Sequence, residues 1–182
     1  MTSTETSHLH YPLSIFYERD GRELPSAERL RPRDVPEPHR RLLVHREDMT
    51  PTLSGYFGEP VRLRVLNVVH EPDFYAREVV LFLASSGRAV EYGAIRIFLE
   101  RFPPGAAKSI VEARQPLGAL LAGIPHFHES PRYFLRVRAN GPVRKVFDLP
   151  SNGLLYARRN TITNDLNEPL ADVLEMLPPL EE

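Results

Sequence analysis

The stretch PVRLRVLNVVHEPDFYAREVVLFLASSGRAVEYGAIRIFL, residues 60–99, decides the fold class. It contains three runs rich in β-branched and aromatic residues, which span residues 60–69, 74–84 and 89–99. The two connections, HEPD and SSGR, are hairpin-sized and carry turn-forming residues. Strands joined by such short turns pair with their neighbours in sequence, so the stretch predicts an antiparallel meander.

The first run also shows the alternation of a half-buried strand. Val61, Leu63 and Val65 point one way in an extended chain, and Arg62 and Arg64 point the other way. This period of two residues is typical of a strand with one face toward a core.

Outside the meander, the same patterns predict further strands and some helices. Two more strands are expected at residues 154–163 and 169–177, joined by the turn sequence NDLNE. A short helix is expected from Pro51 to about Tyr56, because proline is favoured at a first helical position. Other short helical pieces are expected within residues 109–113, 116–123 and 138–149. The sum is an α+β fold: an antiparallel sheet of about six strands with short helices packed on it.

The N-terminal residues 1–40 differ from the rest of the chain. They are polar and contain five prolines, and their main apolar patch includes Ile15, Phe16 and Tyr17. We therefore expect an irregular, proline-rich arm with a disordered tip, which lies across the domain through this patch. Residues 41–182 are expected to form a single domain.

Composition excludes several classes of function. The chain of 182 residues has a net charge of -1, so a nucleic acid or an anionic membrane is not expected as the partner. It has no cysteine, and it shows neither a secretory leader pattern nor an apolar run long enough to span a bilayer. These features indicate a cytoplasmic protein, with a small molecule as the expected partner and an unknown oligomeric state.

Motifs for common cofactors are missing, and metal ligands are sparse. The sequence has no G-x-G-x-x-G, no P-loop and no G-x-S-x-G motif. His126 and His128 would share one face of an extended segment, which could begin a metal site, but Glu129 is the only carboxylate close in sequence. Since loop histidines are common, we expect no metal and no cofactor.

Four stretches together resemble the bacterial chorismate lyase family, whose members cleave chorismate to 4-hydroxybenzoate and pyruvate. These are EDMTPTL, YAREVVLFLASSGRAVEYGAIRI, RQPLGALL and LYARRNTITNDLNEPLADVLEMLPP, in the order in which the family has them. The hairpin turn Leu166–Pro169 departs from the family pattern, which often has a glycine there. The same fold family includes the UTRA-like sensor domain of GntR-type repressors, so a non-catalytic binder of an aromatic acid is the alternative function.

The resemblance implies a pocket under two helical flaps, and it implies the residues that line it. Met49 in the first flap, and Leu117 and Gly118 at the start of the second, match positions near the substrate carboxylate. Arg77 matches the arginine that pairs with this carboxylate. Glu175 matches the glutamate beside the 4-hydroxyl group. No cofactor is implied, because aromatisation of the ring drives the elimination.

The residue types suit these roles. A guanidinium matches a carboxylate bidentately, so Arg77 could bind a ligand carboxylate. The residues alone favour a strand arginine paired with Glu78 or a cross-strand acid, and it is the resemblance that implies the ligand-binding role. Glu175 sits among apolar residues, and such a setting raises the pKa of a carboxyl group and suits a general base. A purely structural domain, with Arg77 and Glu175 paired to each other, is a third possibility. Arg96, Arg158 and Arg159 are further candidates for the second carboxylate of chorismate, and the sequence does not choose among them.

Overall fold

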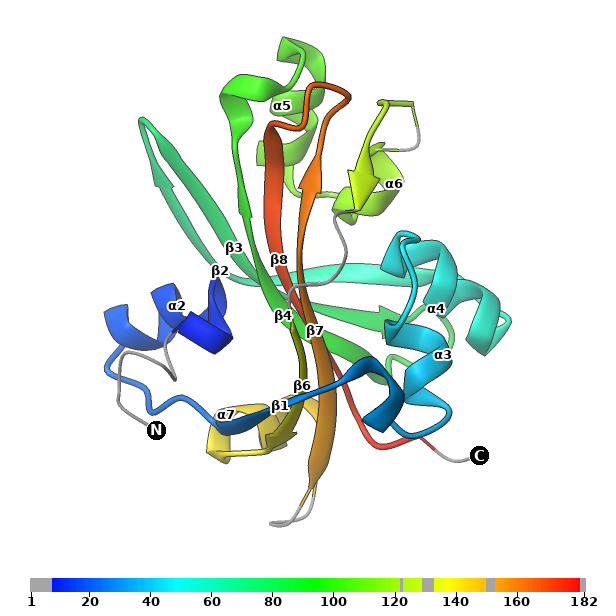
Figure 1. Cartoon of the computed structure of the whole chain (residues 1–182). Helices are drawn as coiled ribbons and strands as arrows, with labels where there is room; N and C mark the ends of the chain where they lie inside the picture. Colours follow the sequence, from blue (N-terminus) through cyan, green and yellow to red (C-terminus); the bar gives the residue numbers. More distant parts are fainter. Residues whose placement is uncertain (1–7, 122, 129–132, 150–152, 181–182) are drawn as a thin grey trace.

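A large antiparallel sheet organises the computed structural model, which describes residues 8–121, 123–128, 133–149 and 153–180 (Figure 1). Its eight described strands are β1 (Ser26–Leu30), β2 (Val61–Glu71), β3 (Phe74–Leu83), β4 (Ala89–Ile97), β5 (Phe127–His128), β6 (Tyr133–Arg138), β7 (Leu154–Thr163) and β8 (Pro169–Leu177). Their order is β1-β6-β7-β8-β4-β3-β2, and the short β5 also pairs with β7. Each paired strand runs antiparallel to its neighbour.

The α+β class and the antiparallel sheet are confirmed, but the expected number of about six strands is wrong. The meander and the C-terminal hairpin lie where the sequence placed them. The strands that sequence analysis missed are β1, β5 and β6. Of these, β1 is short and partly exposed, and β5 has two residues. Such segments become strands because they pair with distant residues, and local periodicity does not record that pairing.

The helices are short. They are α2 (Leu13–Arg19), α3 (His39–Leu43), α4 (Met49–Phe57), α5 (Pro104–Glu112), α6 (Leu117–Leu121) and α7 (Gly141–Phe147), with 3-10 turns at Pro32–Asp34 and Leu99–Arg101. The expected helices correspond to α4, α5, α6 and α7. In the described part of the chain, no helix has the length and apolar character needed to cross a membrane.

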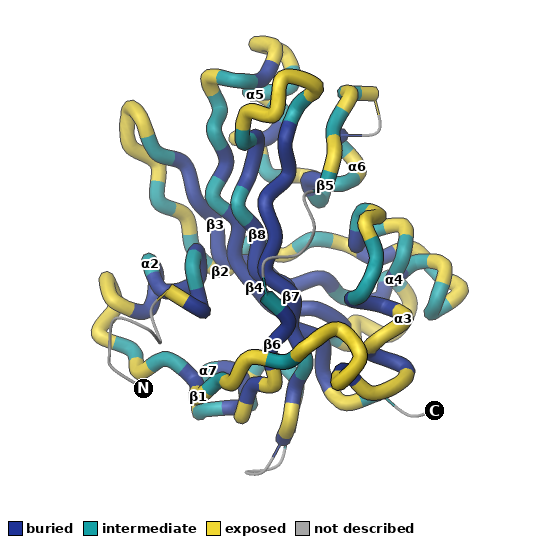
Figure 2. The backbone as a smooth tube through the Cα atoms, in the orientation of Figure 1, coloured by how far each residue is buried: buried dark blue, intermediate teal, exposed yellow. Residues whose placement is uncertain are grey.

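The two faces of the twisted sheet carry different helices (Figures 1 and 2). On one face, α2 and α7 pack over a core that includes Leu13, Phe16 and Tyr17. On the other face, α3 and α4 cover one core cluster, and α5 and α6 cover a second cluster. Buried residues accordingly run through the middle of the sheet in Figure 2. The division of the second face into two clusters leaves space between them.

The N-terminal segment is more ordered than the sequence indicated. Residues 8–40 contain α2 and the edge strand β1, so the expectation of an irregular arm is wrong for them. Phe16 and Tyr17 are fully buried, which confirms that the apolar patch lies across the domain. The hydroxyl of Tyr17 lies 3.1 Å from the hydroxyl of Tyr92 in β4, and this contact ties α2 to the sheet. The tip expected to be disordered, residues 1–7, lies outside the described residues.

Candidate binding pocket under two helices

A pocket opens on the second face, between the two core clusters. It is lined by Asp48, Met49, Thr50, Leu63, Arg77, Val79, Leu81, Glu91, Ala94, Ile95, Pro116, Leu117, Gly118, His128, Ile162, Val173, Leu174 and Glu175. The cavity volume of the pocket is about 60 Å³. A single water needs roughly 10–15 Å³ of such a cavity, so the pocket holds several waters or a small ligand.

Strand register places Arg77 and Glu175 on the same face of the sheet. Arg77 lies opposite Ile95 of β4, and Ile95 lies opposite Val173 of β8. Two residues further along, Gly93 lies opposite Glu175. Side chains directly opposite each other in a sheet share a face, and so do residues two apart in one strand. Both predicted residues therefore line the one pocket.

Gly93 marks a close approach of two strands under this pocket. A Cβ atom built there would lie 1.9 Å from the backbone carbonyl oxygen of Leu174, a distance that no side chain tolerates. Only glycine fits where β4 and β8 meet in this way. The missing side chain also leaves the sheet surface open beside Glu175.

Arg77 is a buried cation without an acidic partner among the described residues. Its exposed fraction is 1%, and no described carboxylate lies within ion-pair distance of it. One contact is a long hydrogen bond, 3.4 Å, from Nη1 to the carbonyl oxygen of Ile110 in α5. The Nε atom is buried and has no hydrogen-bond acceptor. Burial lowers the pKa of this guanidinium, although the neighbouring Tyr75 opposes the shift.

Glu175 does have a partner. Its Oε2 atom accepts a hydrogen bond of 2.5 Å from Nε of Arg158, which lies opposite it on β7. The same guanidinium donates to the backbone carbonyl oxygens of His45 and Glu47 in the segment before α4. The carboxylate that looked out of place in an apolar strand is thus part of a buried ion pair. Burying an ion costs several kcal/mol unless such a partner is present.

Glu91 is a second carboxyl group at this end of the pocket, and sequence analysis missed it. It is 5% exposed, and its Oε2 atom has no hydrogen-bond partner. Burial and then the nearby charge of Glu175 raise its pKa well above the ordinary value, although Arg158 opposes the shift. Its sequence setting, an acid between Val90 and Tyr92, resembles that of Glu175 and was the available signal.

The register also separates the three additional arginines. Arg158 shares the pocket face, whereas Arg96 and Arg159 lie on the opposite face. Arg96 donates to the hydroxyl of Tyr11, 3.0 Å away, and Arg159 donates to the backbone carbonyl oxygen of His8, 2.8 Å away. Of the three, Arg158 alone is therefore close to the pocket in the described structure.

The starts of α4 and α6 meet over the pocket, as expected for two flaps. Met49 and Leu117 are buried and line it. A Cβ atom built on Gly118 would lie 3.2 Å from Oγ1 of Thr50 and 3.3 Å from Cβ of Asp48, so the two flaps are in contact there. The predicted roles of Met49, Leu117 and Gly118 in binding a carboxylate stay predictions.

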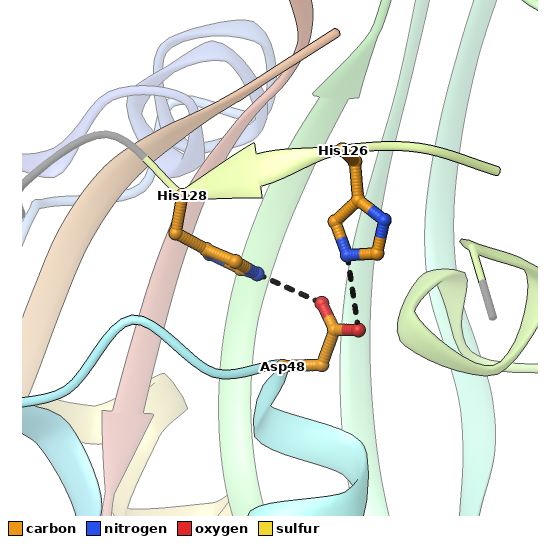
Figure 3. Close-up of side chains that lie close together, drawn as sticks. All are labelled: Asp48, His126 and His128. Atoms are coloured by element: carbon orange, nitrogen blue, oxygen red, sulfur yellow. Dashed lines mark hydrogen bonds and ion pairs between the residues drawn. The ribbon is translucent and has the colours of Figure 1, made fainter. Parts of the chain in front are cut away.

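Asp48 connects the first flap to two histidines at the rim of the pocket (Figure 3). It occupies the N-cap position of α4, but its side chain caps no backbone N–H. Instead Oδ1 lies 2.8 Å from Nε2 of His128, and Oδ2 lies 3.2 Å from Nε2 of His126. Burial opposes the shift, but the two imidazoles lower the pKa of Asp48 below its ordinary value. Sequence analysis named the histidines and missed Asp48, and Glu129 lies outside the described residues.

Comparison with solved structures identifies the fold. The effector domain of PhnF from Mycobacterium smegmatis superposes with a TM-score of 0.55 and 8% identity, over 72% of this chain and 88% of that domain. Full-length PhnF superposes with a TM-score of 0.54 and 8% identity, over 72% of this chain and 63% of the longer one. The C-terminal domain of the histidine utilization repressor from Pseudomonas syringae pv. tomato has a TM-score of 0.46 and 10% identity, over 67% of this chain and 96% of that domain.

The two comparisons with PhnF support the UTRA-like fold of such effector domains, and at this identity they show the fold alone. No protein-family model and no curated protein sequence matches the chain. The expected assignment to chorismate lyase therefore stays a prediction that rests on the quoted stretches.

Proposed function

We propose that this chain binds a small carboxylic acid in the pocket under α4 and α6, and that the apolar part of this ligand is about the size of an aromatic ring. The observation that carries the proposal is Arg77, a buried guanidinium that lines the pocket and has no carboxylate partner among the described residues. A buried charge of this kind is costly, and a bound carboxylate would offset that cost. The planar guanidinium would take both oxygens of the ligand.

The rest of the pocket suits the body of such a ligand. Its walls include the apolar residues Val79, Ile95, Leu117 and Ile162. Apolar walls with few placed polar groups are the usual composition of small-molecule sites. A flat ring fits between the sheet and the flaps, with its carboxylate directed to Arg77.

The far end of the pocket offers groups for a hydroxyl. Glu91 has a raised pKa, so its carboxyl group retains a proton to a higher pH than usual and can donate a hydrogen bond. Glu175, held by Arg158, can accept one. A 4-hydroxylated aromatic acid such as 4-hydroxybenzoate carries a carboxylate at one end and a hydroxyl at the other, and it would match both ends.

The structural comparison supports the binder over the enzyme. PhnF has an effector domain with the same fold, and by its name that domain takes an effector. Fold likeness alone does not transfer a ligand, because one fold hosts many functions. The specific ligand class is therefore inferred from Arg77 and the carboxyl groups opposite it.

Calorimetric titration with 4-hydroxybenzoate tests the proposal. The wild-type chain should bind the acid, and the neutral amide analogue should bind at least tenfold more weakly because it lacks the charge. Arg77→Gln should lose binding to a similar degree. Arg96→Gln is the matched control, since Arg96 lies in the neighbouring strand on the other face, and it should bind like the wild type. Equal binding by Arg77→Gln would contradict the proposal.

A lyase on the same pocket is the second candidate, and the buried Oε2 atom of Glu91, which has no hydrogen-bond partner, favours it. In chorismate, a base takes the proton from the ring carbon that bears the hydroxyl group. The adjacent carbon–oxygen bond breaks, and the enolpyruvate that leaves takes up a proton to become pyruvate. Glu175, the expected base, is already hydrogen-bonded to Arg158, whereas Glu91 has one free buried oxygen. Two carboxyl groups with different environments are a common arrangement for acid–base chemistry.

The two candidates separate in one assay. Purified protein is incubated with chorismate, and the formation of 4-hydroxybenzoate and of pyruvate is measured. A lyase should form the two products in equal amounts. Turnover that Glu91→Gln or Glu175→Gln abolishes, with folding intact by circular dichroism, would support the lyase. Binding of 4-hydroxybenzoate without turnover above the uncatalysed rate would exclude it and leave the binder.

A further inference from the structure

The hydrogen bonds around His126 leave a lone pair facing a carboxylate. Nδ1 of His126 lies 2.8 Å from the backbone carbonyl oxygen of Ile124. A carbonyl oxygen only accepts, so Nδ1 must carry the proton. In the neutral ring, Nε2 is then an acceptor, and it lies 3.2 Å from the acceptor Oδ2 of Asp48. Two acceptors at this distance repel each other unless a cation or a proton lies between them.

The amide of Asn160, which contacts His128, has an unsatisfied oxygen. Nδ2 of Asn160 lies 2.8 Å from Nδ1 of His128, while Oδ1 of Asn160 is buried without a hydrogen-bond partner. The nitrogen and oxygen of an amide occupy nearly equivalent positions, so rotating the amide by half a turn exchanges them. Oδ1 would then accept a hydrogen bond from the Nδ1–H group of His128. That orientation satisfies the buried oxygen and turns Nε2 of His128 into a lone-pair donor as well.

The two rings and the carboxylate then present ligand atoms to one point. One ligand atom from each of Asp48, His126 and His128 lies within 4.8 Å of the others. The two histidines are two residues apart in an extended segment, which directs both rings to one side, and Asp48 approaches from the start of α4 (Figure 3). Each ring is also held at its second nitrogen, by a carbonyl oxygen or an amide, as is usual for metal-ligating histidines.

We propose that Asp48, His126 and His128 bind a divalent transition-metal ion at the rim of the pocket. Two imidazoles and one carboxylate suit zinc, iron, cobalt or nickel better than magnesium or calcium. Three protein ligands leave at least one coordination position open. The ion would join α4 to the segment that follows α6.

Metal binding at this site does not require that the pocket binds a carboxylic acid. Its ligands exclude Arg77, Glu91 and Glu175, although Asp48 and His128 also line the pocket. A metal ion here would fix the start of α4 relative to the segment that contains His126 and His128.

Cobalt absorption provides the test. Tag-free protein is stripped with a chelator, dialysed and titrated with Co²⁺, and the visible bands report nitrogen coordination. Competition with Zn²⁺ then gives the zinc affinity. We expect one ion per chain, and at least a tenfold loss of affinity in Asp48→Asn, in His126→Ala and in Asn160→Leu. His70→Ala, in the exposed end of β2, is the control and should bind like the wild type.

Two results would overturn the proposal. One is the absence of saturable binding with cobalt bands, or equal binding in His126→Ala and the wild type while thermal unfolding shows both folded. The other is a doubly protonated His126 ring at neutral pH, seen by nitrogen NMR, that added Zn²⁺ leaves unchanged. In that case a proton, not a metal ion, joins His126 to Asp48.

Discussion

Nε of Arg158 donates a hydrogen bond of 2.5 Å to Oε2 of Glu175, and both side chains are buried. Arg158 on β7 and Glu175 on β8 lie directly opposite each other. The guanidinium of Arg158 also donates a hydrogen bond to the backbone carbonyl oxygen of Glu47, just before α4. The carboxylate that the sequence suggested as a general base is thereby held in place by an ion pair. The pair links the pocket floor to the first flap.

Removal of one partner of this pair should be strongly destabilising. Glu175→Leu leaves Arg158 buried and unpaired, and the free energy of unfolding should fall by about 3–5 kcal/mol. The double variant Arg158→Met with Glu175→Leu should lose much less, because neither charge remains. Urea unfolding of the three proteins measures the difference. A double variant no more stable than Glu175→Leu would argue against the pair.

Replacement of Arg77 should separate binding from stability. Arg77→Met removes a buried cation that lacks an acidic partner among the described residues, so the free energy of unfolding should rise by roughly 1–3 kcal/mol. The same variant should lose binding of 4-hydroxybenzoate. Urea unfolding and calorimetry on one preparation test both effects. A loss of stability would show that Arg77 is mainly structural.

Glu91 should make stability depend on pH. Its pKa is raised in the folded chain, so between the ordinary value near 4.5 and the raised value the folded state binds more protons than the unfolded state. The contribution of Glu91 to the free energy of unfolding is therefore fully present below pH 4.5, and it is lost as the pH rises through the raised pKa. Glu91→Gln should remove that decrease. Urea unfolding of both proteins from pH 5 to pH 8 measures it, and parallel curves would refute the assignment.

Gly93 should tolerate no side chain. In Gly93→Ala the new Cβ atom meets the carbonyl oxygen of Leu174, and the strands must separate. We expect a loss of about 3 kcal/mol or more, or failure to fold. Gly105→Ala is the control: its Cβ meets nothing within 4 Å, and it lies in α5, where alanine should add roughly 0.5–1 kcal/mol. Thermal unfolding compares the two variants.

Local pattern was enough for much of this fold. The alternation in residues 60–69 and the turns that follow predicted β2, β3 and β4, and the apolar patch around Phe16 predicted contact with the domain. In β3, residues two apart share one face, and Arg77, Val79 and Leu81 all line the pocket. These features depend on residues close in sequence, so periodicity and turn chemistry record them.

Other features arise between residues far apart in the chain. β1 is a strand because it pairs with β6, and β6 also pairs with β7. The partner of Glu175 is fixed by the β7–β8 register. Asp48 reaches His126 and His128 across 78 and 80 positions. The sequence by itself determined the fold class, the meander and the presence of a buried arginine and carboxylate. Only the tertiary structure decided which charges pair, because pairing depends on distances set by strand register and helix packing.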